Sequence, residues 1–177
     1  MIEKEFLNKV ANGKDDFLQS FVDILKKNRI RFCAIGGLAV NAYAEPVVSL
    51  DLDVVIVSEE IEPLMPQLKK RFKVETFANS INVSGKKSDL RIQIQTDERY
   101  QNFLGRAKVK NVLGYKIPVA TIEDVFQGKV WAAMDETRRP SKRQKDLADI
   151  LRLIETKGEL SKLLPTKLKA QLTGDRQ

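Results

Sequence analysis

The chain has 177 residues, of which 42% are hydrophobic and 31% charged, an ordinary composition for a globular protein with a substantial core. It contains no histidine and a single cysteine, Cys33. These counts exclude imidazole acid–base catalysis, histidine-ligated or cysteine-rich metal sites, and internal disulfides. A metal site in this chain would use oxygen ligands, which favour magnesium or manganese.

The net charge of +7 is concentrated toward the C-terminus. Residues 1–136 include 20 basic and 19 acidic residues, whereas residues 137–177 include 11 basic and 5 acidic ones. This distribution indicates an anionic partner such as a polyphosphate, a nucleic acid or an acidic protein, although a solvated basic surface would look the same. No apolar run could span a bilayer, and the first residues lack the pattern of a secretory signal. We therefore expect a cytoplasmic protein that does not contact membranes.

The first two thirds of the chain predict alternating helices and strands. Asp15 and Asp16 precede an apolar stripe over residues 17–25 that has the spacing of a capped amphipathic helix. The run VVSLDLDVVIV at residues 47–57 is the strongest strand signal. Around these two elements we expect strands at 31–35, 72–77, 81–83, 90–94 and 112–119, the last with Gly114 at a bend, and helices at 38–44, 60–71 and 97–108.

The rest of the chain predicts helices alone. Thr121-Ile-Glu-Asp124 resembles a capping box ahead of a helix over 125–134, and Ser141-Lys-Arg-Gln144 has the same pattern ahead of an apolar stripe. A last helix is expected at 160–172. The predicted fold class is α+β, with an α/β core and mixed sheet over residues 1–119 and a helical part over 120–177 packed on it.

Asp51 and Asp53 carry the strongest chemical signal in the sequence. Residues two apart in a strand point to the same face, so both carboxylates leave the strand together. Two like charges side by side repel, and a divalent cation between them converts that repulsion into binding. The competing interpretation is a solvated strand end that holds two unrelated aspartates.

Gly36 and Gly37 strengthen the functional interpretation. They lie between a predicted strand and a predicted helix, shortly before Asp51. Glycines at that place allow the backbone to approach a ligand, and the N-terminus of a helix favours anions. A glycine pair at such a junction is often only a turn. Together with Asp51 and Asp53, it predicts a phosphate-binding loop beside a metal site.

The pattern Ile35-Gly36-Gly37, followed by Leu50-Asp51-Leu52-Asp53-Val54, resembles the polymerase β-type nucleotidyltransferase superfamily. Two later segments, Gly128-Lys129-Val130-Trp131-Ala132 and Lys145-Asp146-Leu147-Ala148-Asp149-Ile150, are similar to its AbiEii-like branch. That branch includes the toxin halves of bacterial toxin–antitoxin and abortive-infection pairs. The resemblance implies a nucleotidyltransferase-like fold and, in a toxin, a cognate antitoxin partner.

By this resemblance, Asp51 and Asp53 hold magnesium or manganese, Gly36 and Gly37 face the nucleotide phosphates, and Lys129 reaches the triphosphate. Asp146 is expected to orient Lys129 or a substrate hydroxyl. A third carboxylate belongs on a neighbouring strand, where Asp89 is the candidate because mid-strand offers only Arg91 and Gln93. The reaction needs aligned groups and cations but no histidine.

The C-terminal charges also have structural interpretations. Lys129 could be an exposed helical lysine, and Asp146 and Asp149 could form surface pairs with Lys142 and Lys145, four residues before each. Five cations, which we call the basic run, lie within eight residues: Arg138, Arg139, Lys142, Arg143 and Lys145. The basic run predicts either a binding site for a nucleic-acid backbone, with Arg138, Arg139, Lys142 and Arg143 as the candidate residues, or a solvated helix start.

Three functions follow from the sequence. The first is a magnesium-dependent nucleotidyltransferase that moves a nucleoside monophosphate from a nucleoside triphosphate onto a hydroxyl of RNA, such as tRNA, or of protein. The second is a catalytically inactive relative that binds nucleotide, RNA or a partner protein. The third is a plain nucleic-acid-binding module, which gives no reason for Asp51 and Asp53. The position of Asp89 discriminates between the first two.

Overall fold

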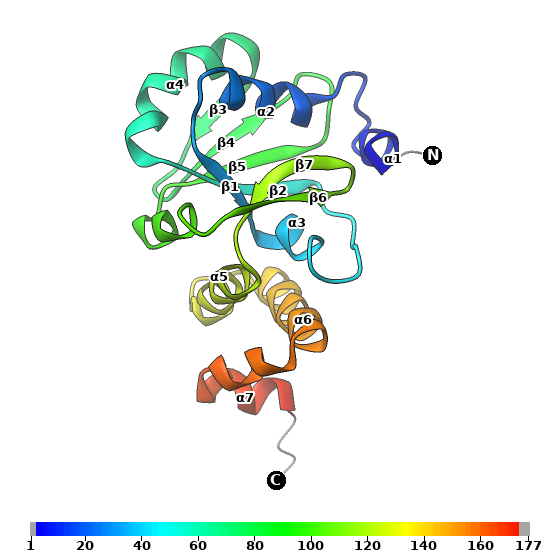
Figure 1. Ribbon diagram of the computed structural model, residues 1–177, viewed down its shortest axis with the longest axis vertical. Coiled ribbons are helices and arrows are strands. Elements are labelled where there is room, and N and C mark those ends of the chain that lie inside the picture. Colours follow the sequence, from blue (N-terminus) through cyan, green and yellow to red (C-terminus); the bar gives the residue numbers. More distant parts are fainter. Residues whose placement is uncertain (1–2, 174–177) are drawn as a thin grey trace.

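Seven strands form one mixed sheet with helices on both of its sides (Figure 1). The structure is a computed structural model and describes residues 3–173. The strands are β1 (Phe32–Ile35), β2 (Asp51–Ile56), β3 (Lys73–Thr76), β4 (Ser80–Ser84), β5 (Arg91–Gln95), β6 (Lys108–Val112) and β7 (Tyr115–Val119). Their order across the sheet is β3-β4-β5-β2-β1-β7-β6. The predicted α+β fold class with a mixed sheet is confirmed.

The helices are distributed unequally along the chain. They are α1 (Glu3–Val10), α2 (Phe17–Lys27), α3 (Gly36–Val40), α4 (Ser58–Arg71), α5 (Ile122–Met134), α6 (Pro140–Thr156) and α7 (Thr166–Thr173), with two 3₁₀ helices, η1 (Glu98–Phe103) and η2 (Gly158–Leu163). In Figure 1, α2 and α4 lie on one side of the sheet, and α3, α5 and α6 lie on the other. Helix α3 contacts both α5 and α6, which pack against each other. No helix within residues 3–173 is long and apolar enough to cross a bilayer.

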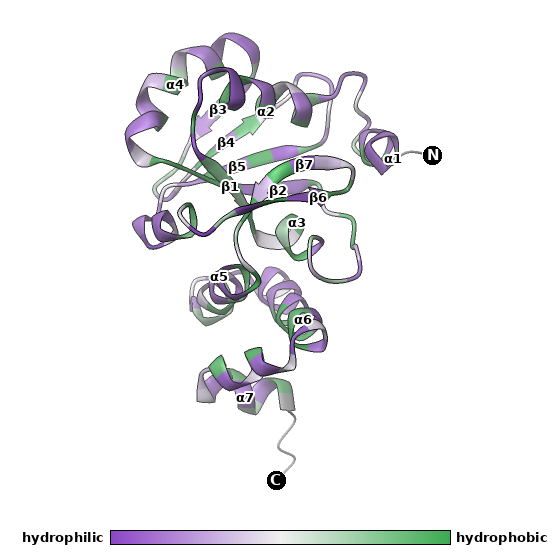
Figure 2. Ribbon diagram, viewed as in Figure 1, coloured by the Kyte–Doolittle hydropathy of each residue, from purple (hydrophilic) through white to green (hydrophobic). Residues whose placement is uncertain are grey.

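Strand β2 lies in the interior of the sheet, between β1 and β5. It runs antiparallel to β1 and parallel to β5. Figure 2 shows hydrophobic and hydrophilic residues mixed within the strands of the sheet. Leu52, Val54 and Ile56 are fully buried, as the alternating pattern predicts. Burial of these side chains fixes the register of β2. The other face of the strand therefore presents Asp51 and Asp53 together.

Local signals set the ends of the helices that were predicted best. The Asp16 carboxylate accepts a hydrogen bond from the Gln19 amide at 3.0 Å and caps α2, whose apolar stripe is buried. The Thr121 hydroxyl accepts one from the Asp124 amide at 3.2 Å and caps α5. The second predicted capping box does not form, because Pro140 already begins α6 and Ser141 lies inside the helix.

Several predicted boundaries are wrong. The expected strand at 112–119 is a hairpin, in which β6 and β7 pair antiparallel and Leu113 and Gly114 form the turn with positive φ. The expected helix at 97–108 is the shorter η1, and the expected helix at 160–172 is divided into η2 and α7. Residues 47–50 precede β2 rather than belonging to it, since the Asn41 side chain bonds the backbone of Val47 on both its N–H and its C=O. Helix α3 starts at Gly36 and ends at Val40, not Ala44.

Candidate active site

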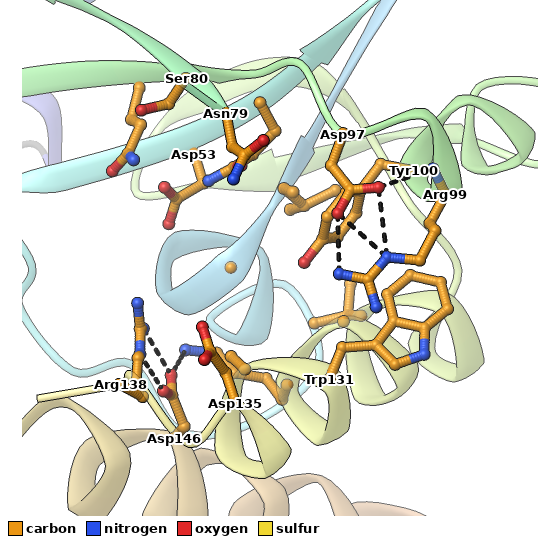
Figure 3. A pocket seen from close by; sticks show the side chains of 18 of the residues that line it. Asp53, Asn79, Ser80, Asp97, Arg99, Tyr100, Trp131, Asp135, Arg138 and Asp146 are labelled. Atoms are coloured by element: carbon orange, nitrogen blue, oxygen red, sulfur yellow. Dashed lines mark hydrogen bonds and ion pairs between the residues drawn. The ribbon is translucent and has the colours of Figure 1, made fainter. Parts of the chain in front are cut away.

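A cavity of about 650 Å³ lies between the sheet and the helical part of the chain. Its sheet side carries Asp53, Asn79 and Ser80, and its helical side carries Trp131 and Arg138 (Figure 3). This volume is typical of small-molecule sites in proteins. Charged side chains dominate its walls, namely Asp51, Asp53, Asp97, Asp124, Asp135 and Asp146 with Arg91, Arg99, Lys129, Arg138 and Lys142. The cavity is therefore suited to a charged ligand.

Gly36 and Asp53 contact each other at the start of α3. Gly36 has φ of +67°, and a Cβ atom built on it would lie 2.3 Å from Oδ2 of Asp53. Any side chain at this position would collide with that carboxylate, and the backbone conformation itself favours glycine. The glycine therefore makes room for Asp53. Gly37 follows in the same turn, and a Cβ atom there would meet the Asp149 carboxylate at an ordinary 3.7 Å.

Two cations hold the Asp51 carboxylate. Arg91 donates to Oδ1 through Nε at 3.0 Å and lies 2.8 Å away through Nη2, and Nζ of Lys142 lies 3.2 Å from Oδ2. Burial raises the pKa of Asp51, but Lys142 and Arg91 together outweigh it and hold the pKa below its usual value. Both pairs are partly exposed, so each is worth about 0–1 kcal/mol.

Asp53 has a different environment. Burial raises the pKa of its carboxyl, Lys129 opposes that rise, and the neighbouring Asp51 adds to it. Within residues 3–173 the Asp53 carboxylate has neither a hydrogen-bond partner nor an ion-pair partner. This carboxylate faces a polar cavity and has space beside it, because Gly36 carries no side chain. It can therefore bind a cation or a hydrogen-bond donor.

Lys129 on α5 lies in a buried ion-pair network with Asp146 and Asp149 on α6. Its ammonium group is 3.0 Å from Asp146 and 2.7 Å from Asp149, and the side chain is only 7% exposed. Burial lowers the pKa of Lys129, but the two aspartates outweigh it and raise the pKa. Asp146 also binds Arg138, and Asp149 binds Arg152. Lys129 is therefore fully paired, although it lines the cavity.

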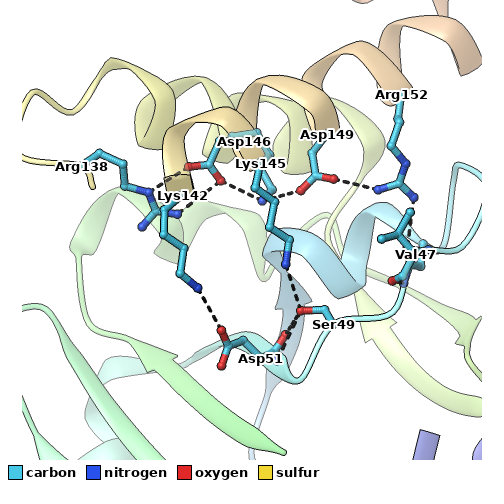
Figure 4. A network of polar contacts seen from close by, with 11 residues as sticks. Val47, Ser49, Asp51, Arg138, Lys142, Lys145, Asp146, Asp149 and Arg152 are labelled. Atoms are coloured by element: carbon cyan, nitrogen blue, oxygen red, sulfur yellow. Dashed lines mark hydrogen bonds and ion pairs between the residues drawn. The ribbon is translucent and has the colours of Figure 1, made fainter. Parts of the chain in front are cut away.

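Three of the four candidate nucleic-acid-binding residues contact other groups of the protein. Arg138 pairs with Asp146, Lys142 with Asp51, and Arg143 donates to the Asp135 carbonyl at 2.7 Å. Arg139 is exposed. The expected pairs between Lys142 and Asp146 and between Lys145 and Asp149 are replaced by these contacts and by a hydrogen bond from Lys145 to Ser49 at 3.4 Å. Figure 4 shows Lys142 and Lys145 reaching from α6 toward Asp51 and Ser49.

Asp89 lies away from the aspartate pair. It is exposed just before β5, accepts a hydrogen bond from Asn12 at 2.6 Å, and does not line the cavity. In the register of β2 and β5, Asp51 stands opposite Arg91 and Asp53 opposite Gln93. Among residues 3–173, no group of three acidic or other ligating side chains is arranged to hold a metal ion. The expected three-carboxylate arrangement is therefore not formed.

The donor set nevertheless fits one magnesium ion. Asp51 and Asp53 supply carboxylate oxygens from one face of β2, and Asp53 has no competing partner among the described residues. Magnesium in proteins is commonly held by one or two carboxylates together with substrate phosphates. A second ion would need a further carboxylate, and Arg91 and Gln93 occupy the nearest places on β5.

Sequence reasoning missed two parts of the cavity. The first is the set of contacts between Asp51 and its cations, which depends on strand register and on where α6 docks. The second is the far wall, where Asp97 binds Arg99 and the Arg99 guanidinium lies 4.8 Å from the centre of the Trp131 ring. Trp131 also stacks on Phe103. No short motif in the sequence marks these residues.

Comparisons with known proteins concern the fold. No protein-family model matches the sequence, and no curated protein matches it. Among solved structures, the antibiotic-resistance factor ANT(2'')-Ia in complex with adenylyl-2''-tobramycin is similar with a TM-score of 0.61 at 13% identity, covering 89% of this chain and 95% of that one.

Two further structures are similar. The lincosamide antibiotic adenylyltransferase LnuA, bound to lincomycin, has a TM-score of 0.56 at 12% identity over 80% of this chain and 99% of its own. An antigenic nucleotidyltransferase-like protein from Paracoccidioides brasiliensis has a TM-score of 0.57 at 15% identity over 96% and 88%. The chain therefore has the fold of nucleotidyltransferases.

Proposed function

We propose that this protein is a magnesium-dependent nucleotidyltransferase, which transfers a nucleoside monophosphate from a nucleoside triphosphate to a hydroxyl group. The observation that carries the proposal is the pair Asp51 and Asp53 on one face of β2. Gly36 leaves space for the Asp53 side chain, which lines a polar cavity. The nucleotidyltransferase fold and the oxygen-only donor set support it.

The residues of the chain have separate roles in this proposal. Asp51 and Asp53 hold the cation, which when bound neutralises phosphate charge and lowers the pKa of the attacking hydroxyl. Gly36 allows the phosphates to approach the backbone beside Asp53. Lys129 and Asp146 fix α5 against α6 and so keep the wall of the cavity in place. Transfer of this kind depends mainly on alignment and charge stabilisation.

Two classes of molecule are candidates for the acceptor hydroxyl. The sequence predicts a hydroxyl of RNA or protein. A hydroxyl of a small molecule is the second candidate, because the cavity has the size of a small-molecule site and two similar structures are bound to an adenylylated or unmodified antibiotic. The toxin–antitoxin role and an antitoxin partner stay predictions that rest on the sequence resemblance.

A catalytically inactive nucleotide-binding protein is the alternative. The position of Asp89 favours it, because a site with two carboxylates lacks the usual third one that would accept the proton of the attacking hydroxyl. Turnover of a nucleoside triphosphate, measured as pyrophosphate release in the presence of candidate acceptors, separates the two functions.

The first test is metal-dependent nucleotide binding. We expect Asp53→Asn and Asp51→Asn to abolish the gain in affinity that magnesium gives to a non-hydrolysable nucleoside triphosphate, measured by calorimetry with each of the four bases. Asp89→Asn is the matched control and should bind as the unmodified chain does. Unchanged magnesium-dependent binding in Asp53→Asn would refute the proposed function, and loss of binding in Asp89→Asn would restore that residue as a ligand.

A further inference from the structure

Arg91 and Lys142 differ from Lys129 in how tightly they are held. The Lys129 side chain is 7% exposed and bound to two aspartates, whereas Arg91 and Lys142 are 44% and 38% exposed. Breaking a buried ion pair leaves an unpaired charge in the interior, while a solvent-exposed pair separates at little cost. The two exposed cations are therefore the ones that an incoming anion can recruit.

Both cations bind the same carboxylate, each at a different oxygen. Arg91 contacts Oδ1 of Asp51 and Lys142 contacts Oδ2. Both also line the cavity beside Asp53. A phosphate group, like a carboxylate, can accept two parallel hydrogen bonds from a guanidinium. An anion placed next to Asp51 can thus replace it as the partner of both cations.

The place of Arg91 in the sheet strengthens this argument. It stands opposite Asp51 in the register of β2 and β5, on the strand where a third carboxylate was expected. The charge there is positive where a negative one was anticipated. Asp51, Asp53, Arg91 and Lys142 sum to a formal charge of zero, so this corner does not repel a polyphosphate even before a divalent cation binds.

We propose that Arg91 and Lys142 are the triphosphate-binding residues of this site, and that they exchange the Asp51 carboxylate for phosphate oxygens when the nucleotide enters. The exchange releases Asp51 to bind the cation. Polyphosphate binding therefore persists without a divalent metal. This inference rests on the proposed function for the identity of the ligand as a nucleotide, but its chemistry concerns the phosphates alone.

Titration of the full chain with inorganic tripolyphosphate in EDTA tests the inference without metal, base or acceptor. We expect Arg91→Gln and Lys142→Gln each to weaken binding at least tenfold, since each removes charge-assisted hydrogen bonds. Lys116→Gln makes the same charge change at an exposed position on β7 outside the cavity, and it should stay within twofold of the unmodified chain. Binding by Arg91→Gln and Lys142→Gln equal to that of Lys116→Gln would overturn the inference.

The exchange itself is tested by removing the competing carboxylate. Asp51→Asn should bind tripolyphosphate in EDTA at least threefold more tightly than the unmodified chain, because its two cations are released. Asp53→Asn removes the same charge but no partner of Arg91 or Lys142, so its gain should be smaller. Equal gains in the two variants would show a general charge effect and refute the exchange.

The outcomes separate this inference from the proposed function. If tripolyphosphate binds as expected but no nucleoside triphosphate shows magnesium-dependent binding, the phosphate site stands and the nucleotidyltransferase proposal fails. If nucleotides bind with magnesium while Arg91→Gln has no effect, the proposed function stands and the inference fails. An unmodified chain that binds no polyphosphate under either condition refutes both.

Discussion

Asp51 and Asp53 are two residues apart on one strand, yet their surroundings affect their carboxyl groups in opposite directions. Lys142 and Arg91 outweigh the effect of burial at Asp51, so its pKa is lowered. At Asp53 burial prevails and the pKa is raised. A charged Asp51 is thus favoured by the fold, whereas a charged Asp53 is disfavoured. Binding of a cation would relieve the unfavourable burial of charge at Asp53.

This difference predicts opposite effects of two similar substitutions on stability. The folded-state pKa of Asp53 lies above its unfolded value of about 3.9, so the folded chain binds more protons between those two values and stability falls as pH rises through them. Asp53→Asn removes this loss and should raise the urea midpoint at pH 7, with a smaller difference as the pH approaches 4.

The Asp51 carboxyl has the opposite effect on the pH dependence of stability. Its folded-state pKa is lowered, so its contribution to stability is present above the unfolded pKa and is lost as the pH falls through the folded pKa. Asp51→Asn should therefore lower stability at pH 7 by up to about 1 kcal/mol, the scale of partly exposed ion pairs. Urea unfolding from pH 4 to pH 8 measures both effects, and shifts of the same sign at pH 7 would contradict the assigned environments.

At the scale of elements, local signals predicted what depends on local chemistry. The stripe of α2 with Asp16 as its cap, the Thr121 cap of α5 and the alternation in β2 are all visible in the sequence and present in the structure. The hairpin of β6 and β7 was missed because Gly114 lies between residues of similar propensity on either side. A continuous run of residues with strand propensity does not show where the chain reverses direction. In the structure, the reversal is at Leu113 and Gly114, which both have positive φ.

The candidate site was likewise predictable only where it depends on residues close together in the sequence. Gly36, Asp51 and Asp53 could be placed together from their spacing, because β1, α3 and β2 follow one another along the chain. The partners of these residues could not. Arg91 meets Asp51 through strand register over 40 positions, and Lys142 meets it over 91 positions through the docking of α6. The resemblance implies that Lys129 reaches the triphosphate and that Asp146 orients it, but the second partner of Lys129, Asp149, could not be predicted from the sequence.

Substitution of Lys129 tests whether this residue joins α5 to α6 or binds the triphosphate. Lys129→Met leaves two buried carboxylates short of one partner and should destabilise the chain by about 3 kcal/mol, the scale for breaking a buried pair. Affinity for tripolyphosphate should change less than twofold. Urea unfolding and calorimetry measure the two quantities on the same protein.

A double variant controls this experiment. Asp149→Asn combined with Lys129→Met removes one of the two carboxylates that lose Lys129, while Asp146 keeps Arg138 and Arg152 keeps its hydrogen bonds to Asn41 and the Glu45 carbonyl, so part of the stability should return. A large loss of polyphosphate affinity with unchanged stability would contradict the buried network and return Lys129 to the role that the sequence resemblance implies.

At the scale of the whole molecule, the positive charge after residue 136 is divided between internal contacts and the outer surface, where Arg139, Lys145, Lys162, Lys167 and Lys169 are exposed. Arg138, Lys142 and Arg143 bind groups of the protein itself, and Arg138 and Lys142 line the cavity. A nucleic-acid backbone lying along α6 would have to break these contacts. The positions of Arg138 and Lys142 thus fit a small polyphosphate entering the cavity better than a long anion on the outer surface.

The salt dependence of RNA binding decides between these two uses of the basic run. Each phosphate contact of a single-stranded RNA contributes about 0.7 to the slope of log K against log salt concentration. We expect that changing Arg138, Arg139, Lys142 and Arg143 together to Gln flattens the slope by no more than about 0.7, because Arg138 and Lys142 line the cavity and Arg143 donates to the Asp135 carbonyl. Urea unfolding of the variant checks that loss of the internal contacts has not unfolded it, and Arg139→Gln alone should give the same slope. A flattening of about 2–3, equivalent to three or four lost contacts, would contradict this assignment and make RNA the leading acceptor.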